Sequence, residues 1–130
     1  MSSFLAELKI EEVTLKVLEC KFEYNVKTDE TGFQSQRALP GNLNITIEST
    51  NKLDFVAWML QDEMKDGEIV FFKRDMMSSA KTVSFAQAFC IHYSEIFTSE
   101  GDIPMKTNIV LSVYELAVDS TCIIQNWSIE

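Results

Sequence analysis

The chain offers few side chains that could do chemistry, and their spacing argues against a catalytic site. His92 is the single histidine, so a metal site built from several histidines is excluded. It lies in an apolar, strand-like stretch, and no serine or cysteine stands near it at a spacing typical of a nucleophile and its base. We therefore interpret His92 as a packed, hydrogen-bonded strand residue. We expect no catalytic residue, no metal and no cofactor.

The cysteines predict neither a disulfide framework nor a zinc site. Cys20, Cys90 and Cys122 are odd in number, widely separated and without a CxxC pair. A free cysteine usually behaves as a small buried hydrophobic residue. We expect all three to be inert residues of the core.

The acidic residues pair up at predicted turns, as in Glu11–Glu12, Asp62–Glu63 and Glu100 with Asp102. Solvated charge is the ordinary interpretation of such pairs. An enzyme that uses two converging carboxylates remains an alternative, although no spacing supports it. Four glycines, none in a phosphate-binding pattern, are too few for a nucleotide loop.

Composition and charge narrow the class further. The chain has 130 residues, 46% apolar and 24% charged, which predicts a single globular domain over residues 1–130. Its net charge of −9 argues against binding to nucleic acid or to anionic lipid surfaces. No apolar run approaches the length of a membrane span, and the first residues lack the pattern of a secretory signal. We expect a cytoplasmic protein with no membrane insertion.

Apolar and polar residues alternate with a period of two through most of the chain, which is typical of half-buried strands. One predicted strand face carries Leu18, Cys20, Phe22, Tyr24 and Val26. Another strand carries Leu43, Ile45 and Ile47, and further strands are predicted over Phe4–Ile10 and residues 68–74, 82–97, 107–118 and 122–127. Long strands with short turns and no alternating helices predict a mainly β fold. We expect an antiparallel β-barrel of two packed sheets, with one flanking α-helix and a long extended loop.

A helix is predicted over residues 52–63, after three possible capping residues at 49–51. Phe55 through Leu60 are all apolar, whereas a helix packed on one sheet needs only an apolar stripe. Its second side is then covered either by another subunit or by the end of its own barrel, and the pattern favours neither.

Residues 27–40 form an unusually long connection between two predicted strands, where loops of two to five residues are typical. Its first part, Thr28–Gly32, can turn tightly because it combines Asp29 with a glycine. Phe33 and Leu39 are bulky apolar residues in a segment that should be exposed. We expect them to dock onto another surface, and the alternative is that both fold back onto their own domain.

Apolar surface left over on the helix and the loop indicates self-assembly. The first rival interpretation is a small-molecule carrier, because this length suits a closed β-barrel that holds one apolar ligand. A carrier should be a monomer with an open cavity, whereas a self-assembling subunit should not.

Several motifs then give the sequence a family resemblance. They are residues 18–24 (LECKFEY), 28–32 (TDETG), Arg37, residues 48–50 (EST), Trp58–Met59, residues 65–75 (KDGEIVFFKRD) and residues 104–107 (PMKT). In this order the chain resembles the compact branch of the inner-tube proteins of the type VI secretion system, the Hcp or TssD family.

The resemblance implies a structural protein and not an enzyme. It implies a homohexameric ring, rings stacked into a hollow tube, and expulsion of that tube by a contracting sheath without a signal peptide. Sheath, spike and baseplate proteins and secreted effectors are the implied partners. It also implies that the long loop contacts the adjacent ring through Thr28, Asp29, Thr31, Gly32, Phe33, Gln34, Arg37 and Leu39. The helix, with Phe55, Trp58 and Met59, would lie at the subunit boundary.

Overall fold

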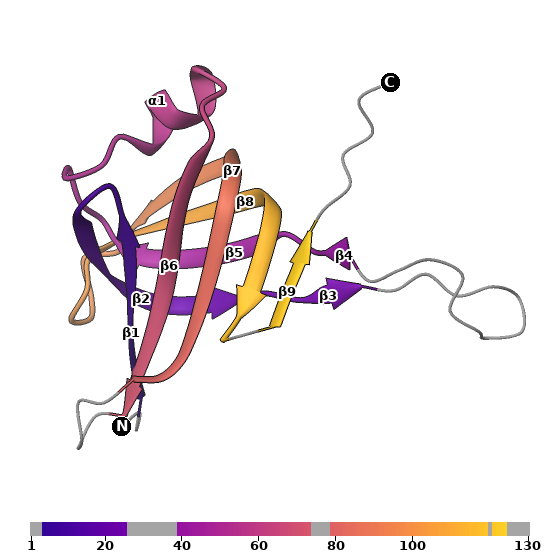
Figure 1. The fold of residues 1–130 in the computed structure, drawn as a ribbon. Coiled ribbons are helices and arrows are strands. Elements are labelled where there is room, and N and C mark those ends of the chain that lie inside the picture. The colour runs from indigo at the N-terminus through magenta and orange to yellow at the C-terminus, as the bar shows by residue number, and fades with distance from the viewer. Residues whose placement is uncertain (1–3, 26–38, 74–78, 120, 125–130) are drawn as a thin grey trace, which may run out of the picture.

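The computed structural model describes residues 4–25, 39–73, 79–119 and 121–124. These residues form strands and one short helix (Figure 1). In chain order the elements are β1 (Phe4–Ile10), β2 (Val13–Lys21), β3 (Tyr24–Asn25), β4 (Leu39–Pro40), β5 (Leu43–Glu48), α1 (Phe55–Leu60), β6 (Lys65–Lys73), β7 (Ser79–Phe97), β8 (Met105–Val118) and β9 (Thr121–Ile124).

The predicted antiparallel β-barrel is confirmed. Its wall is one continuous sheet in the order β5-β2-β1-β6-β7-β8-β9, and a further β5–β8 pairing closes it. We expected two packed sheets; the strands instead wrap round because β5 has β2 on one side and β8 on the other. Strands β3 and β4 form a separate two-stranded ribbon that leads away from the barrel (Figure 1).

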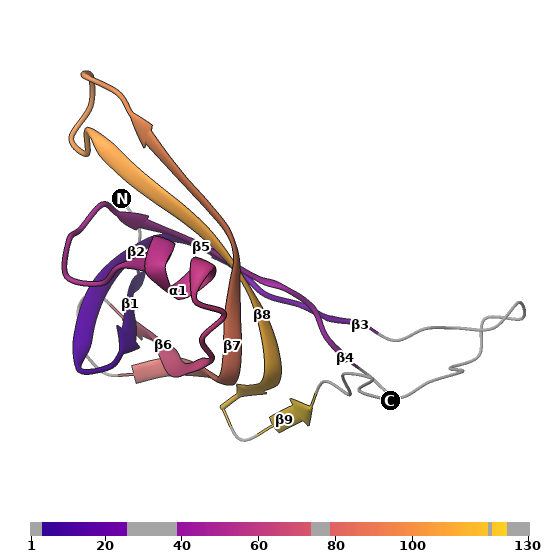
Figure 2. The same ribbon diagram turned by 90° about the horizontal axis from the view of Figure 1, so that it is seen from above.

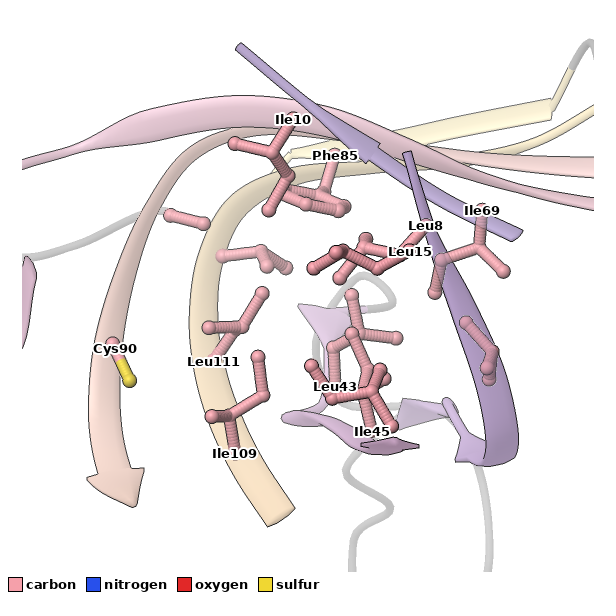
Figure 3. Packing of buried hydrophobic residues seen from close by; sticks show 14 of the residues in the cluster. Leu8, Ile10, Leu15, Leu43, Ile45, Ile69, Phe85, Cys90, Ile109 and Leu111 are labelled. Atoms are coloured by element: carbon pink, nitrogen blue, oxygen red, sulfur yellow. The ribbon is translucent and has the colours of Figure 1, made fainter. Parts of the chain in front are cut away.

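The barrel interior is filled by side chains that alternate along the strands. Leu43, Ile45 and Ile47 of β5 have no exposed surface, as the period of two predicts. They meet the inward residues of β1, β2, β6, β7 and β8, which point toward one another in Figure 3. Trp58 of α1, 1% exposed, joins the same core. The fully buried aliphatic and aromatic side chains supply the main stabilising term of the fold.

Close backbone packing explains the glycine at position 67. Gly67 lies in β6 opposite Ile10. A Cβ at this position would lie 2.7 Å from Cζ of Phe85 and 2.8 Å from both Cγ1 of Ile10 and the carbonyl oxygen of Lys9. Only glycine therefore fits without moving a strand.

The β1–β2 hairpin confirms the turn predicted at Glu11–Glu12. Ile10 pairs with Val13, and the two central residues have φ of 51° and 67°, the mirror-image turn that suits the twist of a hairpin. Glutamate pays a steric cost in this conformation. An ion pair between Glu11 Oε2 and Lys65 Nζ at 2.8 Å helps to offset it.

Two details differ from the sequence-based expectation. The helix begins at Phe55 and is capped by Asp54, whose carboxylate accepts from the N–H of Ala57 at 3.0 Å, so the caps predicted at residues 49–51 are wrong. A β-bulge between Val17 and Glu19 also shifts the alternation in β2. Val17 and Cys20 face the core while Leu18 does not, so Leu18 is wrongly placed on the buried face.

Candidate assembly interface

The outer half of β7 leaves the barrel with only one neighbouring strand. Strand β6 pairs with β7 from Ser79 to Ala88, whereas β8 pairs with it from Val83 to Phe97. Beyond Ala88 the β7–β8 hairpin projects past the barrel body (Figure 2). Among the described residues, none pairs with β7 on its other side over Ile91–Phe97. We call this segment, residues 91–97, the open edge of β7.

The hydrogen-bond pattern shows which groups of this open edge face outward. The N–H of Thr98 donates to the carbonyl oxygen of Pro104 at 2.7 Å, and the register from Phe97 to His92 is unbroken. Bonded and non-bonded pairs alternate in an antiparallel ladder. The N–H and C=O groups of Tyr93, Glu95 and Phe97 therefore point away from β8, toward a missing strand.

Strand β2 carries a second open edge. Within the described part of the chain it pairs with β1 only up to Val17, and from Glu19 to Lys21 its one partner is β5. The N–H of Ser49 donates to the carbonyl oxygen of Met105 at 3.1 Å, which fixes the alternation along β5. It follows that Glu19 and Lys21 bond to β5, and that the backbone groups of Cys20 point outward.

These two edges bound one four-stranded sheet. We call it the flank: β2 (residues 19–21), β5 (43–48), β8 (105–111) and β7 (92–97), in that order and antiparallel throughout. Its inner face packs on the barrel core at Cys20 and Tyr93, which are partly buried, whereas Glu95 and Phe97 of the projecting hairpin are exposed. Its two outer strands have backbone groups that no described residue pairs with, which is the arrangement that templates pairing with another chain.

The outer face of the flank is mostly polar, apart from Ile96 and Val110, and carries balanced charge. The Asn108 amide nitrogen donates to Oδ1 of Asn44 at 2.8 Å and to Oγ1 of Thr46 at 3.0 Å. Around this network lie two glutamates and two lysines, namely Glu19, Glu48, Lys21 and Lys106. Their formal charges cancel, although the whole chain carries −9.

Trp58 marks the point where β6 leaves β7. Its indole N–H donates to the carbonyl oxygens of Glu63 at 2.8 Å and Ala88 at 3.2 Å. Lys65 lies 5.8 Å from the centre of the Trp58 ring and bridges Glu11 and Glu63. Burial alone would lower the pKa of Lys65, but its hydrogen bonds to the two carboxylates outweigh this and raise it. The cluster fixes α1 and the β1–β2 turn over one end of the barrel.

The residues predicted for the helix contact lie mostly inside the chain. Phe55 and Trp58 are buried and Met59 is partly buried against the core. The barrel end therefore covers one side of α1, and what covers its second side stays a prediction. Val56 and Leu60 are the exposed apolar residues of α1, 37% and 75% exposed, and a contact between subunits through this helix would have to use them.

The predicted stacking loop falls almost wholly outside the described residues. That holds for Thr28, Asp29, Thr31, Gly32, Phe33, Gln34 and Arg37. The backbone of Leu39 lies in β4, where it pairs with Asn25. The role given to this loop stays a prediction.

The residues considered for chemistry are dispersed. His92 lies in β7 as expected but is exposed, so its interpretation as a packed residue is wrong. The described part of the chain holds no group of three or more His, Cys, Asp or Glu side chains that could bind a metal. Cys90 is buried and Cys20 is half-buried, both with free thiols; the side chain of Cys122 lies outside the described residues. Burial raises the pKa of the Cys20 thiol to about 11, so the thiolate nucleophile is scarce at neutral pH.

Sequence reasoning missed the two open edges. The available signal was length, because residues 82–97 were already predicted as one strand far longer than the five to six residues of an average strand. A strand that outruns the barrel must leave part of itself without a second neighbour. The fold and these edges together define a class of protein: a closed antiparallel β-barrel with two open strand edges on one flank.

Comparison with known proteins identifies the family. A model of the haemolysin co-regulated protein Hcp (TssD) matches residues 2–128, so the chain belongs to the Hcp family of type VI secretion tube proteins. No relative among curated proteins matches. In the described residues we find no helix with the length and apolar character needed to cross a membrane.

Solved structures share the fold. The chain is similar to Hcp1 from Flavobacterium johnsoniae, with 26% identity over 93% of this chain and 99% of that one and a TM-score of 0.84. It is similar to Hcp1 from Salmonella typhimurium, with 12% identity, 88% and 85% coverage and a TM-score of 0.74. A six-fold symmetrised anti-feeding prophage baseplate gives 9% identity, 93% and 95% coverage and a TM-score of 0.56.

Proposed function

We propose that this protein is the repeating subunit of a type VI secretion inner tube, in which copies join edge to edge into a closed hexameric ring. The observation that carries the proposal is the pair of open edges, β7 and β2, at opposite ends of one four-stranded flank. The family supports the tube, and the six-fold symmetry of the prophage baseplate structure supports the number of copies.

The strand directions suit such a joint. Neighbours in the flank are antiparallel, and there are four strands, so β2 and β7 run in opposite directions. A rotation about a ring axis carries one copy to the next without reversing its strands. The β7 edge of one copy therefore meets the β2 edge of the next in the antiparallel sense.

The faces and the hydrogen-bonding groups also match. Residues that bond directly across an antiparallel joint place their side chains on the same face. The outward groups of β7 belong to Tyr93, Glu95 and Phe97, and those of β2 belong to Cys20. Tyr93 and Cys20 both face the barrel core, and Glu95 and Phe97 share the face of Tyr93 because they lie two and four residues further on.

Joined in this way, the flanks form one continuous sheet whose polar face lines the lumen. The Asn44–Thr46–Asn108 network and the balanced charges around it suit a water-filled channel that neither attracts nor repels cargo strongly by charge. Effectors carried in the tube would meet this surface. The rival carrier function is not favoured, because large side chains occupy the barrel interior.

Membership of the family also supports ring stacking and sheath-driven expulsion without a signal peptide. It further supports contacts with sheath, spike and baseplate proteins. The loop of residues 27–40 is the proposed contact to the adjacent ring. Six copies at −9 each would carry −54, so rings should repel one another. Long tubes should need added salt, crowding or a baseplate template, since 0.1 M salt screens charges over about 10 Å. Light scattering across a salt series tests this, and equal growth at low salt would contradict it.

Two variants at one position test the joint. Glu95→Pro removes an outward N–H without touching the β7–β8 bonds, whereas Glu95→Gln loses the same charge and keeps the N–H. The proposal expects the wild type and Glu95→Gln to form rings by native mass and negative-stain imaging, and Glu95→Pro to remain folded and not form rings. Rings of Glu95→Pro as stable as those of the wild type would show that this edge is not the joint.

A further inference from the structure

The open edge of β7 has the composition of a segment that pairs with itself. Residues 91–97 read IHYSEIF and carry one formal charge, that of Glu95. Ile91, Ile96 and Phe97 are 52%, 62% and 65% exposed. Exposed edges rich in apolar and β-forming residues are hazards for unwanted pairing, and a charge placed within them is the usual protection.

The geometry makes this hazard specific. Two copies of the β7 edge can pair in the antiparallel sense about a two-fold axis at Glu95. This register uses all three outward residues of each copy, setting Tyr93 of each against Phe97 of the other. Aromatic pairs directly across strands on one face are favourable. Apart from the pair of glutamates at its centre, the edge is self-complementary.

Those glutamates would face each other. Cβ atoms of directly opposed residues lie about 5 Å apart, so the two carboxylates would repel at short range. The groups that face Glu95 do not offset this repulsion. The Tyr93 hydroxyl donates to its Oε1 at 2.9 Å, and Asp54, the charged group that acts on Tyr93 from the start of α1, is also acidic. None of the ion pairs between described residues includes Glu95.

We propose that Glu95 determines the partner of the β7 edge by preventing it from pairing with the β7 edge of a second copy. The edge then remains available to pair with the β2 edge of the next copy. The barrel-facing residues there are Cys20 and Phe22, and neither is charged at neutral pH. This choice of β2 rests on the ring proposed above, whereas the exclusion of β7–β7 pairing does not.

The test compares Glu95→Gln with Glu100→Gln, which loses the same charge at an exposed site in the hairpin turn, outside residues 91–97. Native mass spectrometry over a concentration series measures monomer, dimer and ring. We expect rings without dimers for the wild type and Glu100→Gln. For Glu95→Gln we expect a new dimer, which corresponds to a β7–β7 association constant raised by at least about tenfold, the size of one unit-charge repulsion at short range. Adding Phe97→Pro to Glu95→Gln should remove that dimer, because it deletes an outward N–H of the self-paired register.

The outcomes separate the two proposals. If the wild type forms rings and Glu95→Gln gives no dimer beyond that of Glu100→Gln, the role of Glu95 is wrong and the ring stands. If dimers appear for Glu95→Gln while the wild type never forms rings, the role of Glu95 stands and the ring fails. A dimer that persists with Phe97→Pro is not β7–β7 pairing and also overturns the role of Glu95.

Discussion

The closed side of the barrel and the flank are built from continuous strands of the same sheet, yet they differ in how their edges are satisfied. On the closed side, β1 and β6 each have a partner on both sides. In the flank, β2 beyond Val17 and β7 beyond Ala88 have one partner each among the described strands. The chain therefore completes the closed side of its sheet by itself. In the flank the side chains are in place, but the two outer strands have one neighbour each among the described strands.

The largest expected effect falls on the closed side. Trp58→Ala should lower the free energy of unfolding by about 3–5 kcal/mol, because it empties a fully buried site and leaves two carbonyl oxygens without their donor. Leu60→Ala on the same helix, at a side chain 75% exposed, should change it by less than about 0.5 kcal/mol. Urea denaturation measures both. Equal losses would mean that α1 is not fixed by Trp58.

Gly67→Ala should come next, lowering the free energy of unfolding by about 2 kcal/mol. The added methyl group would overlap Phe85, Ile10 and the backbone of Lys9, so β1 and β6 must separate. Glu68→Ala, one residue further along β6, is the control and should cost far less. Thermal unfolding of the two variants compares them, and an unchanged midpoint for Gly67→Ala would contradict the close packing.

Proline substitutions at Ser94 and Glu95 compare a residue whose N–H bonds to β8 with a residue whose N–H points outward. The alternation set by Thr98 and Pro104 predicts that the N–H of Ser94 bonds to β8 and that the N–H of Glu95 does not. Ser94→Pro should therefore destabilise the monomer by about 2 kcal/mol more than Glu95→Pro. Denaturation at concentrations below assembly measures the difference. The reverse order would show that the open edge is assigned to the wrong residues.

The smallest effect is expected at the ion pairs that hold the helix end. Lys65→Met should lower the free energy of unfolding by about 1 kcal/mol, since Glu11 and Glu63 are both half exposed. The pKa of Lys65 is raised on folding, so its contribution is full below its ordinary pKa and is lost as the pH rises through the folded value. The wild type should therefore lose its advantage over Lys65→Met in alkaline solution and in high salt. If the advantage of the wild type persists in alkaline solution and in high salt, it comes from packing of Lys65 on Trp58.

Much of the fold could be predicted because its signals are local. The period of two in residues 43–47 placed three side chains that are fully buried, and the Glu11–Glu12 turn falls where it was expected. The helix start was wrong because Asp54, and not residues 49–51, caps the first turn by accepting from the N–H of Ala57. The face of Leu18 was wrong because a bulge after Val17 depends on the pairing with β5. Period alone carries no information about such insertions.

The site was harder to predict for a similar reason. Phe55 and Trp58 were predicted to lie at the subunit boundary, and the barrel end buries them instead. An open edge consists of backbone groups, which every residue has, so no residue type marks it. The length predicted for residues 82–97 was the available signal, and the three-dimensional pairing shows where β7 outruns β6.

Amide hydrogen exchange resolved to single residues, compared between dissociated and assembled protein, tests the central claim most directly. The account predicts that the amides of Tyr93, Glu95, Phe97 and Cys20 exchange fast in the dissociated chain and become protected on assembly. Those of Ser94 and Ile96, which bond to β8, should be protected in both states. Assembly that leaves Tyr93, Glu95 and Phe97 as exposed to exchange as before would contradict the account.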